Sequence, residues 1–549
     1  MTKPIQIAIF PLLLGLFFCA ASLTPSLIPR DWQQQALLCG GVAAAGYALG
    51  RLVQVIWTAL AIPVPGPRTQ KIAFVAIGVG LAVHWVIAVL SATRWQAATR
   101  PKLGMPPFSP LDWLFVILGA VVIFAVLFAI GAGIKWLFLR VRDWLYRRMP
   151  RRSANLLGFL LVLLAFFVLT RDGLVPLIYR SLDTGFVEMQ RLFDDAPPAP
   201  EDPRMPGSAA SHVDWQALGQ PGRNFVTEGP DAAAITALTG RPAQEPIRVY
   251  VGLAQADTPE ARAEIALEEL KRLNAFDREV LVVATPTGTG WLDPGAMDTV
   301  DYIHDGDIAT VAVQYSYMQS PFALIFQTDR APLQATATLR VIMDHWRSLP
   351  RDSRPRLYLH GLSLGAWSSI ASVDVFDSIS DPMEGAFWVG TPFVSDTWRR
   401  MTERRTPGSP FVNPVIADGA LARFMSQYGG LDRATAPWSD VRVIFLQYGS
   451  DAITFYEPAS LWRAPEWMNE PLAPDVWPGL RFWPVVTQFQ LAVDMMLAER
   501  VPAGQGHHYA ADDYLDGWIA LTDPEGWTPE DTEALKALCA ATEAHGCGG

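Results

Sequence analysis

The feature that most constrains this chain is the uneven distribution of its apolar residues. Five stretches within the first 180 residues are long and mostly apolar, whereas residues 194–549 have the mixed composition of an ordinary globular protein. A helix needs roughly 17–25 mostly apolar residues to cross a bilayer. We therefore expect about five transmembrane helices, the fifth being the shortest, at residues 5–23, 36–57, 72–90, 113–136 and 154–170.

The first stretch has two readings. Lys3 precedes an apolar run that ends near Ala20, Ala21 and Ser22, which resembles a secretory signal peptide with a cleavage site. Because further apolar stretches follow it, we favour an uncleaved first helix. His84, in the third stretch, has no acidic partner in any predicted span, so we expect a helix–helix hydrogen bond there rather than a proton pathway.

The basic residues of short loops predict the orientation in the membrane. Six arginines lie between residues 140 and 152, so the loop between the fourth and fifth stretches is expected in the cytoplasm. If the fifth stretch spans, the rest of the chain is extracytoplasmic, which is the placement we expect. If that stretch is only re-entrant or lies on the surface, the C-terminal domain is cytoplasmic instead.

Composition divides the chain and excludes one class of partner. We expect a transmembrane domain at residues 1–180, an acidic, proline-rich linker at 181–208 and a folded domain at 209–549. The net charge of −11 is opposite to what phosphate binding requires, so no nucleic-acid partner is expected. Cys539 and Cys547 can pair if the C-terminus faces an oxidising compartment.

The C-terminal domain alternates strand and helix patterns, which predicts a mostly parallel sheet flanked by helices. Short β-rich runs occur at residues 249–253, 280–284, 310–315, 356–359 and 441–446. Helices are expected at 261–273 and 513–521, and helical spacing on one face is seen at Leu339, Ile342, Met343 and Trp346.

A candidate nucleophile follows the fourth of these strands. Residues 361–365 read Gly-Leu-Ser-Leu-Gly, a G-x-S-x-G sequence between a predicted strand and a predicted helix. On such a tight turn the serine hydroxyl projects from the sheet edge, and the flanking glycines avoid clashes. Ser363 is therefore the predicted nucleophile, while a purely structural turn is the alternative.

An activated serine needs a base and an orienting carboxylate, which in this arrangement follow in the order acid, then histidine. Asp451 lies just beyond the strand at 441–446, at the end from which it can reach a histidine loop. His507 and His508 lie in a glycine-rich turn before the last predicted helix, and these residues alone do not decide between them. His545 lies in a Gly- and Ala-rich tail, a poor support for a catalytic group.

The oxyanion of the reaction needs backbone donors. We expect one from Leu364 and another from the glycine-rich loop at 285–291, with Gly288 and Thr289 as candidates. A phosphate-binding loop is the rival reading of that segment, but its lysine and serine are absent. No metal site and no cofactor is expected.

Four tryptophans lie between the predicted acid and the predicted histidine, interspersed with prolines, at Trp462, Trp467, Trp477 and Trp483. They fit a lid or apolar wall for an acyl chain as well as they fit ordinary packing.

Together these motifs resemble a bacterial family of α/β-hydrolases with an N-terminal membrane domain. The resemblance rests on the serine turn and on residues 22–30, 247–253, 284–291, 314–317 and 450–453. The usual histidine segment of that family reads Gly-His-Gly-His-x-Tyr, which implies His507 as the catalytic histidine. Here Gln505 replaces the first histidine, and Leu362 stands where the family often has Glu.

The resemblance implies a serine hydrolase at the cell membrane that uses Ser363, Asp451 and His507. We expect its substrate to be a small-molecule or lipid-like carboxylic ester, with membrane lipids as its surroundings. A peptidase or thioesterase with the same triad, and a non-catalytic membrane protein whose hydrolase fold binds a ligand or partner, are the alternatives.

Overall fold

The computed structural model of the 549-residue chain describes residues 8–168, 197–318, 329–374, 380–542 and 546–547. The chain divides into two compact units. We call the first the helical unit, Met1–Ile178 with Tyr456–Pro502, and the second the sheet unit, Tyr179–Phe455 with Ala503–Gly549. The predicted domain limits 1–180, 181–208 and 209–549 stay predictions, and residues 181–196 and His545 lie outside the described residues.

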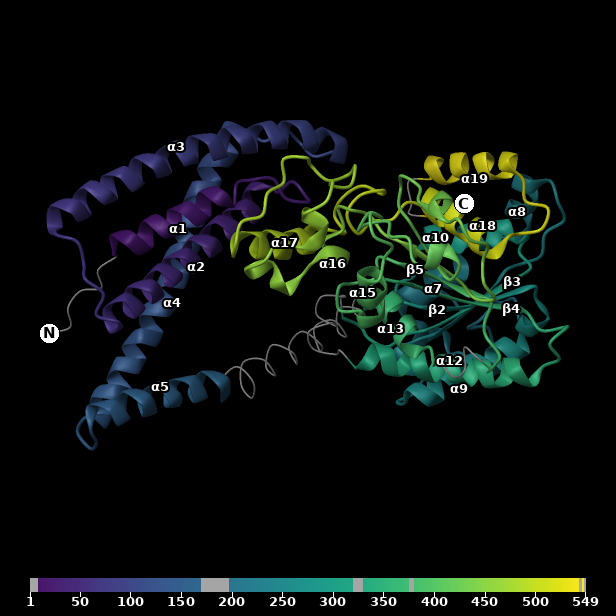
Figure 1. Ribbon diagram of the computed structural model, residues 1–549. Coiled ribbons are helices and arrows are strands. Elements are labelled where there is room, and N and C mark those ends of the chain that lie inside the picture. Colours follow the sequence, from purple (N-terminus) through teal and green to yellow (C-terminus); the bar gives the residue numbers. More distant parts are fainter. Residues whose placement is uncertain (1–7, 169–196, 319–328, 375–379, 543–545, 548–549) are drawn as a thin grey trace. The chain divides into compact units, whose positions relative to one another are not determined.

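Residues 8–168 of the helical unit form five helices, shown in purple to blue in Figure 1. They are α1 (Ile9–Ala21), α2 (Trp32–Ala59), α3 (Pro67–Thr99), α4 (Pro110–Leu145) and α5 (Arg151–Val168). Three helical stretches are long and apolar enough to cross a membrane by length and composition: Trp32–Ala59, Pro67–Leu103 and Pro110–Leu145. The first and fifth predicted spans coincide with shorter apolar helices, and their ends at residues 5–7 and 169–170 lie outside the described residues.

Local signals in the sequence explain where these helices begin and how they pack. Ser109 and Asp112 form a capping box at the start of α4, and Pro110 occupies its first turn. Helices α1 and α2 approach closely at glycines: a Cβ added to Gly46 would lie 2.9 Å from Gly15 Cα. Small residues at such positions let helix backbones pack side by side.

The helix–helix hydrogen bond expected at His84 is made by another residue. Trp85, its neighbour, donates the helix–helix hydrogen bond, from Nε1 to Leu16 O at 3.2 Å. The ring of His84 instead stacks on Phe17 with centroids 5.2 Å apart and lies 5.7 Å from Trp483. Trp483 therefore packs inside the helical unit, which is the ordinary-packing reading of that tryptophan.

The sheet unit is built on seven strands that all pair in parallel, in the order β1-β3-β2-β4-β5-β7-β6. The strands are β1 (Ile247–Val251), β2 (Val280–Thr285), β3 (Ile308–Val313), β4 (Arg356–Leu362), β5 (Gly385–Val389), β6 (Ala422–Met425) and β7 (Arg442–Leu446). The mostly parallel sheet predicted from the sequence is confirmed. The inner strands are buried along their length, as strands covered on both faces must be.

Helices cover both faces of this sheet. Figure 1 shows α9 (Pro259–Arg272), α12 (Arg330–Ser348) and α13 (Leu364–Ser372) gathered on one side. On the other side lie α10 (Pro294–Ile303) and α18 (Ala511–Thr522). Further α-helices among the described residues of the sheet unit are α7 (Gly219–Thr227), α8 (Ala232–Thr239), α15 (Asp396–Glu403), α16 (Ala452–Phe455) and α19 (Pro529–Ala541).

The four cysteines and one inserted segment complete the description of the fold. Cys539 and Cys547 form a disulfide at the C-terminal end of α19. Cys19 and Cys39 are buried in the helical unit and form no disulfide. The segment 456–502, including α17 (Val486–Leu497), belongs to the helical unit although it lies between Asp451 and His507 in the sequence.

Candidate active site

Ser363 lies on a strained turn between β4 and α13. Its φ of 57° and ψ of −125° are rarely adopted by a residue with a side chain, and backbone strain of this kind is concentrated at functional sites. A Cβ added to Gly361 would lie 2.5 Å from Gly365 C, and one added to Gly365 would lie 2.1 Å from Thr285 O. Both glycines of the motif are therefore required for close backbone approach.

His507 and Asp451 meet as a buried pair. His507 Nδ1 lies 2.7 Å from Asp451 Oδ2, and both side chains are almost fully buried. Asp451 follows β7, and His507 lies in a tight loop in which Gly504 N–H donates to His508 O. The structure thus brings His507, rather than the alternative His508, into contact with the predicted acid.

Asp451 is held by more donors than the sequence analysis anticipated. Its carboxylate accepts hydrogen bonds from Ile453 N at 2.8 Å and from Thr454 Oγ1 at 2.9 Å. Tyr509 Oη donates to the same oxygen that contacts His507, at 2.7 Å. These bonds fix the carboxylate in one orientation and satisfy its lone pairs without water.

No local sequence pattern predicts the roles of Thr454 and Tyr509. Both lie within the segments that carry the family resemblance or directly beside them. Their positions in these segments were the only sequence signal that could have indicated a role in the site. Burial, reinforced by the negative charge of Asp451, raises the pKa of Tyr509 well above its usual range. Tyr509 is therefore a neutral hydroxyl that donates to Asp451 at neutral pH.

The backbone of Ser363 and the ring of His507 both adjoin the end of β5. Ser363 N–H donates to Val389 O at 2.9 Å, and Gly390 follows directly with φ of 53°. A Cβ on Gly390 would lie 2.6 Å from His507 Cε1, so the imidazole packs on this glycine. Ser363, Asp451 and His507 therefore all belong to loops at the carboxyl edge of the sheet, where open α/β sheets bind ligands.

The predicted oxyanion loop adjoins the serine turn. The close approach of Gly365 to Thr285 O places residues 286–291 beside the start of α13. Within this loop Thr287 N–H donates to Trp291 O and Gly290 N–H donates to Thr287 O, both at 2.9 Å. Those two N–H groups are engaged in the turn, and the predicted donors Gly288 and Thr289 lie between them. Their role and that of Leu364 stay predictions.

Side chains from neighbouring strands brace the same loop. Tyr250 Oη donates to Gly290 O at 2.7 Å, and Gln314 Nε2 donates to Thr289 O at 3.0 Å. Because the carbonyls of the loop are held in this way, its backbone has one fixed orientation.

Two further buried carboxyl groups of the sheet unit are those of Asp293 and Asp513. Burial raises the pKa of Asp293 to about 7 and that of Asp513 to about 6. Tyr514 Oη donates to Asp293 Oδ2 at 3.0 Å, and Tyr448 Oη donates to Asp513. Within the described ranges, no group of three or more His, Cys, Asp or Glu side chains is arranged to hold a metal ion.

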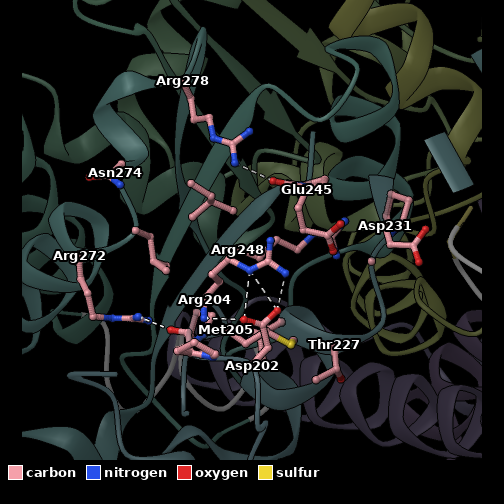
Figure 2. A pocket seen from close by; sticks show the side chains of 18 of the residues that line it. Asp202, Arg204, Met205, Thr227, Asp231, Glu245, Arg248, Arg272, Asn274 and Arg278 are labelled. Atoms are coloured by element: carbon pink, nitrogen blue, oxygen red, sulfur yellow. Dashed lines mark hydrogen bonds and ion pairs between the residues drawn. The ribbon is translucent and has the colours of Figure 1, made fainter. Parts of the chain in front are cut away.

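A cavity of about 750 Å³ lies elsewhere in the sheet unit, at the start of β1. Figure 2 shows Arg204, Arg248, Arg272 and Arg278 around it. Arg248 pairs with Asp298 and Asp301, and Arg204 pairs with Asp202, each at 2.7 Å. Ser363, Asp451 and His507 do not line this cavity, so its size does not identify it as the reaction site.

The parallel sheet, the strained serine turn and the order Ser363, Asp451, His507 define the class of α/β-hydrolase folds. The chain belongs to the Alpha/beta-hydrolase family, whose sequence profile matches residues 247–535. A second profile, the Alpha/beta-hydrolase family N-terminus, matches residues 23–230. No curated protein and no solved structure matches the chain.

Proposed function

We propose that this protein is a membrane-anchored serine hydrolase that cleaves carboxylic esters through Ser363, His507 and Asp451. The observation that carries the proposal is the buried pair of His507 and Asp451 beside a serine held at positive φ. Membership of the family supports hydrolysis as the reaction class. The fold alone supports no particular substrate.

The chemistry follows from these positions. The Ser363 hydroxyl attacks the ester carbonyl while its proton passes to His507, whose imidazolium is oriented by Asp451. The resulting oxyanion accepts hydrogen bonds from backbone N–H groups of Leu364 and of Gly288 or Thr289. When the intermediate collapses, the alcohol leaves with the proton from His507, and an acyl group stays on Ser363. Water, deprotonated by His507, then releases the acid and restores the serine.

A lipid-like ester is the proposed substrate class. The α2, α3 and α4 helices expose many large apolar side chains, including Ile72, Val79 and Val121, each about 60 % exposed. Helices of this length and composition suit a bilayer, where apolar esters concentrate.

Labelling with a fluorophosphonate probe tests the proposal. Full-length protein in detergent micelles should be labelled, and Ser363→Ala should abolish labelling. Ser368→Ala is the matched control, because Ser368 is a buried serine of the same helix α13 and labelling should be unchanged. Folded wild-type protein that resists the probe would contradict the proposal and favour a ligand- or partner-binding role.

We also propose that the sheet unit is extracytoplasmic. The Cys539–Cys547 disulfide supports this placement, since disulfides persist in oxidising compartments. In intact cells treated with a thiol-blocking reagent, Cys539 and Cys547 should react with a mass-tagged maleimide only after reduction. No reaction even after reduction would show that both thiols were free and already blocked, which would contradict the placement.

A further inference from the structure

The segment 456–502 has an unusual course. The chain passes into it five residues after Asp451, at Tyr456, and returns from it at Pro502, five residues before His507. The segment itself is part of the helical unit. Both partners of Ser363 are therefore carried on connections that start from, or end in, the helical unit.

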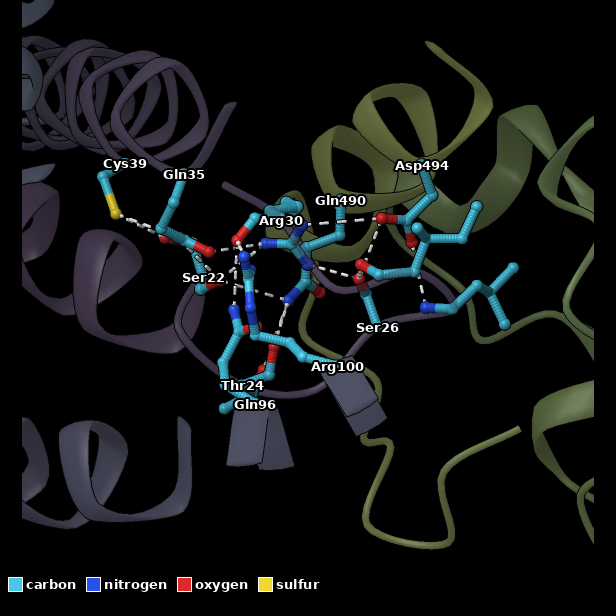
Figure 3. Close-up of polar contacts among 12 residues, drawn as sticks. Ser22, Thr24, Ser26, Arg30, Gln35, Cys39, Gln96, Arg100, Gln490 and Asp494 are labelled. Carbon is cyan, nitrogen blue, oxygen red and sulfur yellow. Dashed lines mark hydrogen bonds and ion pairs between the residues drawn. The ribbon is translucent and has the colours of Figure 1, made fainter. Parts of the chain in front are cut away.

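Within the helical unit, α17 is fixed to the loop between α1 and α2 by a buried carboxylate. Asp494 accepts hydrogen bonds from Ser26 Oγ at 2.9 Å and from Leu27 N at 3.0 Å. Its Oδ1 lies 3.5 Å from Arg30 Nε, and both charged side chains are fully buried. Figure 3 shows Arg30 and Asp494 at the centre of these contacts.

A second contact lies one helical turn earlier on the same face of α17. Gln490 Nε2 donates to Thr24 O at 3.0 Å and to Ser22 O at 3.4 Å. Residues four apart on a helix point to one side, so Gln490 and Asp494 bind the loop 22–30 together. We call these contacts, from Gln490 and Asp494 to residues 22–30, the α17 anchor.

Arg30 links the α17 anchor to two more helices. Its Nη1 donates to Gln35 Oε1 in α2 at 3.0 Å. Its carbonyl accepts from Gln96 Nε2 at the end of α3, at 3.3 Å, and from Arg100 Nη1 at 3.1 Å. The position of α17 is thus defined relative to α1, α2 and α3 at once.

The chemistry of the α17 anchor indicates that it sets a register. Burial lowers the pKa of Arg30 and raises that of Asp494, so desolvation opposes much of the attraction within the pair. A buried ion pair is weak evidence for stability, and its best-attested use is to allow one arrangement and exclude slipped ones. An apolar contact at the same place would let α17 shift along the loop.

We propose that Asp494 and Gln490 are positioning residues for the hydrolase reaction: by fixing α17 on the loop 22–30, they set where the chain departs after Asp451 and returns before His507. The inference rests on the proposed function. The helical unit is then more than a membrane anchor. The position of α17 on the loop 22–30 governs how accurately Asp451 and His507 are placed for reaction with Ser363.

The test uses full-length protein in detergent micelles and two matched substitutions, Asp494→Asn and Asp112→Asn. Asp112 is a carboxylate of the helical unit that accepts two hydrogen bonds from Ser109 in the α4 capping box. For Asp494→Asn we expect the rate of fluorophosphonate labelling per folded molecule to fall about ten-fold or more, since small misplacements of catalytic groups are costly. Asp112→Asn should label at the wild-type rate.

Two further measurements separate positioning from mere stability. With a short, water-soluble ester, Asp494→Asn should lower kcat and leave KM unchanged. Partial unfolding, in contrast, lowers the amount of active enzyme but does not change the rate of probe labelling per folded molecule. If Asp494→Asn does not fold, Gln490→Leu keeps the ion pair and should give a smaller loss, of about three-fold. Wild-type rates in the folded anchor variant, or equal losses in Asp112→Asn, would overturn the inference. An unlabelled wild type would overturn the proposed function itself.

Discussion

In the sheet unit most large apolar side chains are buried, while in the helical unit many of them are exposed. Among the described residues of the sheet unit, the large apolar side chains that are exposed are Leu333, Leu421 and Tyr428. Along α2, α3 and α4 exposed leucines, isoleucines and valines continue from turn to turn. Scattered exposed apolar residues are normal, but a continuous apolar surface marks a surface that is covered by something else.

The buried polar groups differ as well. In the sheet unit several of them surround the candidate reaction site, where Asp451 accepts four hydrogen bonds from Ile453, Thr454 and Tyr509 in addition to its contact with His507. In the helical unit they join segments that are distant in the sequence, as Ser26 and Asp494 do over 468 positions. We therefore propose a chemical use of buried polarity in one unit and a positional use in the other.

The largest expected effect is confined to the sheet unit. Asp451→Asn should lower kcat for an ester by about 10⁴-fold, because the amide no longer holds the imidazole in the required tautomer. The substitution should leave the unfolding of the helical unit unchanged. A loss below ten-fold, measured with p-nitrophenyl butyrate, would show that Asp451 does not orient the base.

Stability of the sheet unit should depend on pH through Asp293. Its pKa is about 7 in the folded state because of burial, and about 4 when unfolded. The folded state therefore binds more protons between these values, so the free energy of unfolding falls as the pH rises from about 4 to 7, by up to about 4 kcal/mol.

Asp293→Asn isolates this contribution because the amide stays neutral. The variant should lose part of the pH dependence and be more stable than wild type at pH 8, as measured by chemical denaturation at pH 5 and pH 8. Identical slopes for the variant and the wild type would contradict the assignment.

The helical unit is expected to be sensitive to size where α1 and α2 meet. Gly46→Ile should destabilise this unit by about 2–3 kcal/mol, because an added Cβ would already lie 2.9 Å from Leu14 O. Gly41→Ile is the control on the same helix, since a Cβ there meets nothing within 4 Å. Unfolding in mixed micelles measures both, and equal losses would mean that α1 and α2 do not pack as described.

The smallest expected effect tests the hydrogen bond from Tyr509 that helps to hold Asp451 in place. Tyr509→Phe removes one hydrogen bond to Asp451 while keeping the ring, so kcat should fall about ten-fold. Ester hydrolysis at saturating substrate measures it. An unchanged kcat would reduce Tyr509 to a packing residue.

The parts of the site that sequence reasoning identified are local. A G-x-S-x-G sequence after a strand defines its own turn, and an aspartate just beyond the end of a strand is placed by the sheet. Strands β5 (Gly385–Val389) and β6 (Ala422–Met425) were not anticipated from the sequence. The roles of Thr454 and Tyr509 depend on tertiary contacts that no local pattern encodes.

The parts that sequence reasoning did not identify are long-range. Segment 456–502 was read as a lid, a wall or ordinary packing, and nothing in its composition indicates that α17 binds the loop 22–30. Of the five predicted spans, three coincide with helices of sufficient length, because the apolar runs near residues 9 and 152 form shorter helices among the described residues.

The most direct test of the central claim is a rapid-mixing measurement of the acyl-enzyme. Wild-type protein mixed with excess p-nitrophenyl butyrate should release a burst of nitrophenol close to one equivalent, and mass spectrometry of the quenched sample should place the butyryl group on Ser363. Ser363→Ala should give neither the burst nor the adduct. A burst that survives Ser363→Ala, or an acyl group on another residue, would contradict the account.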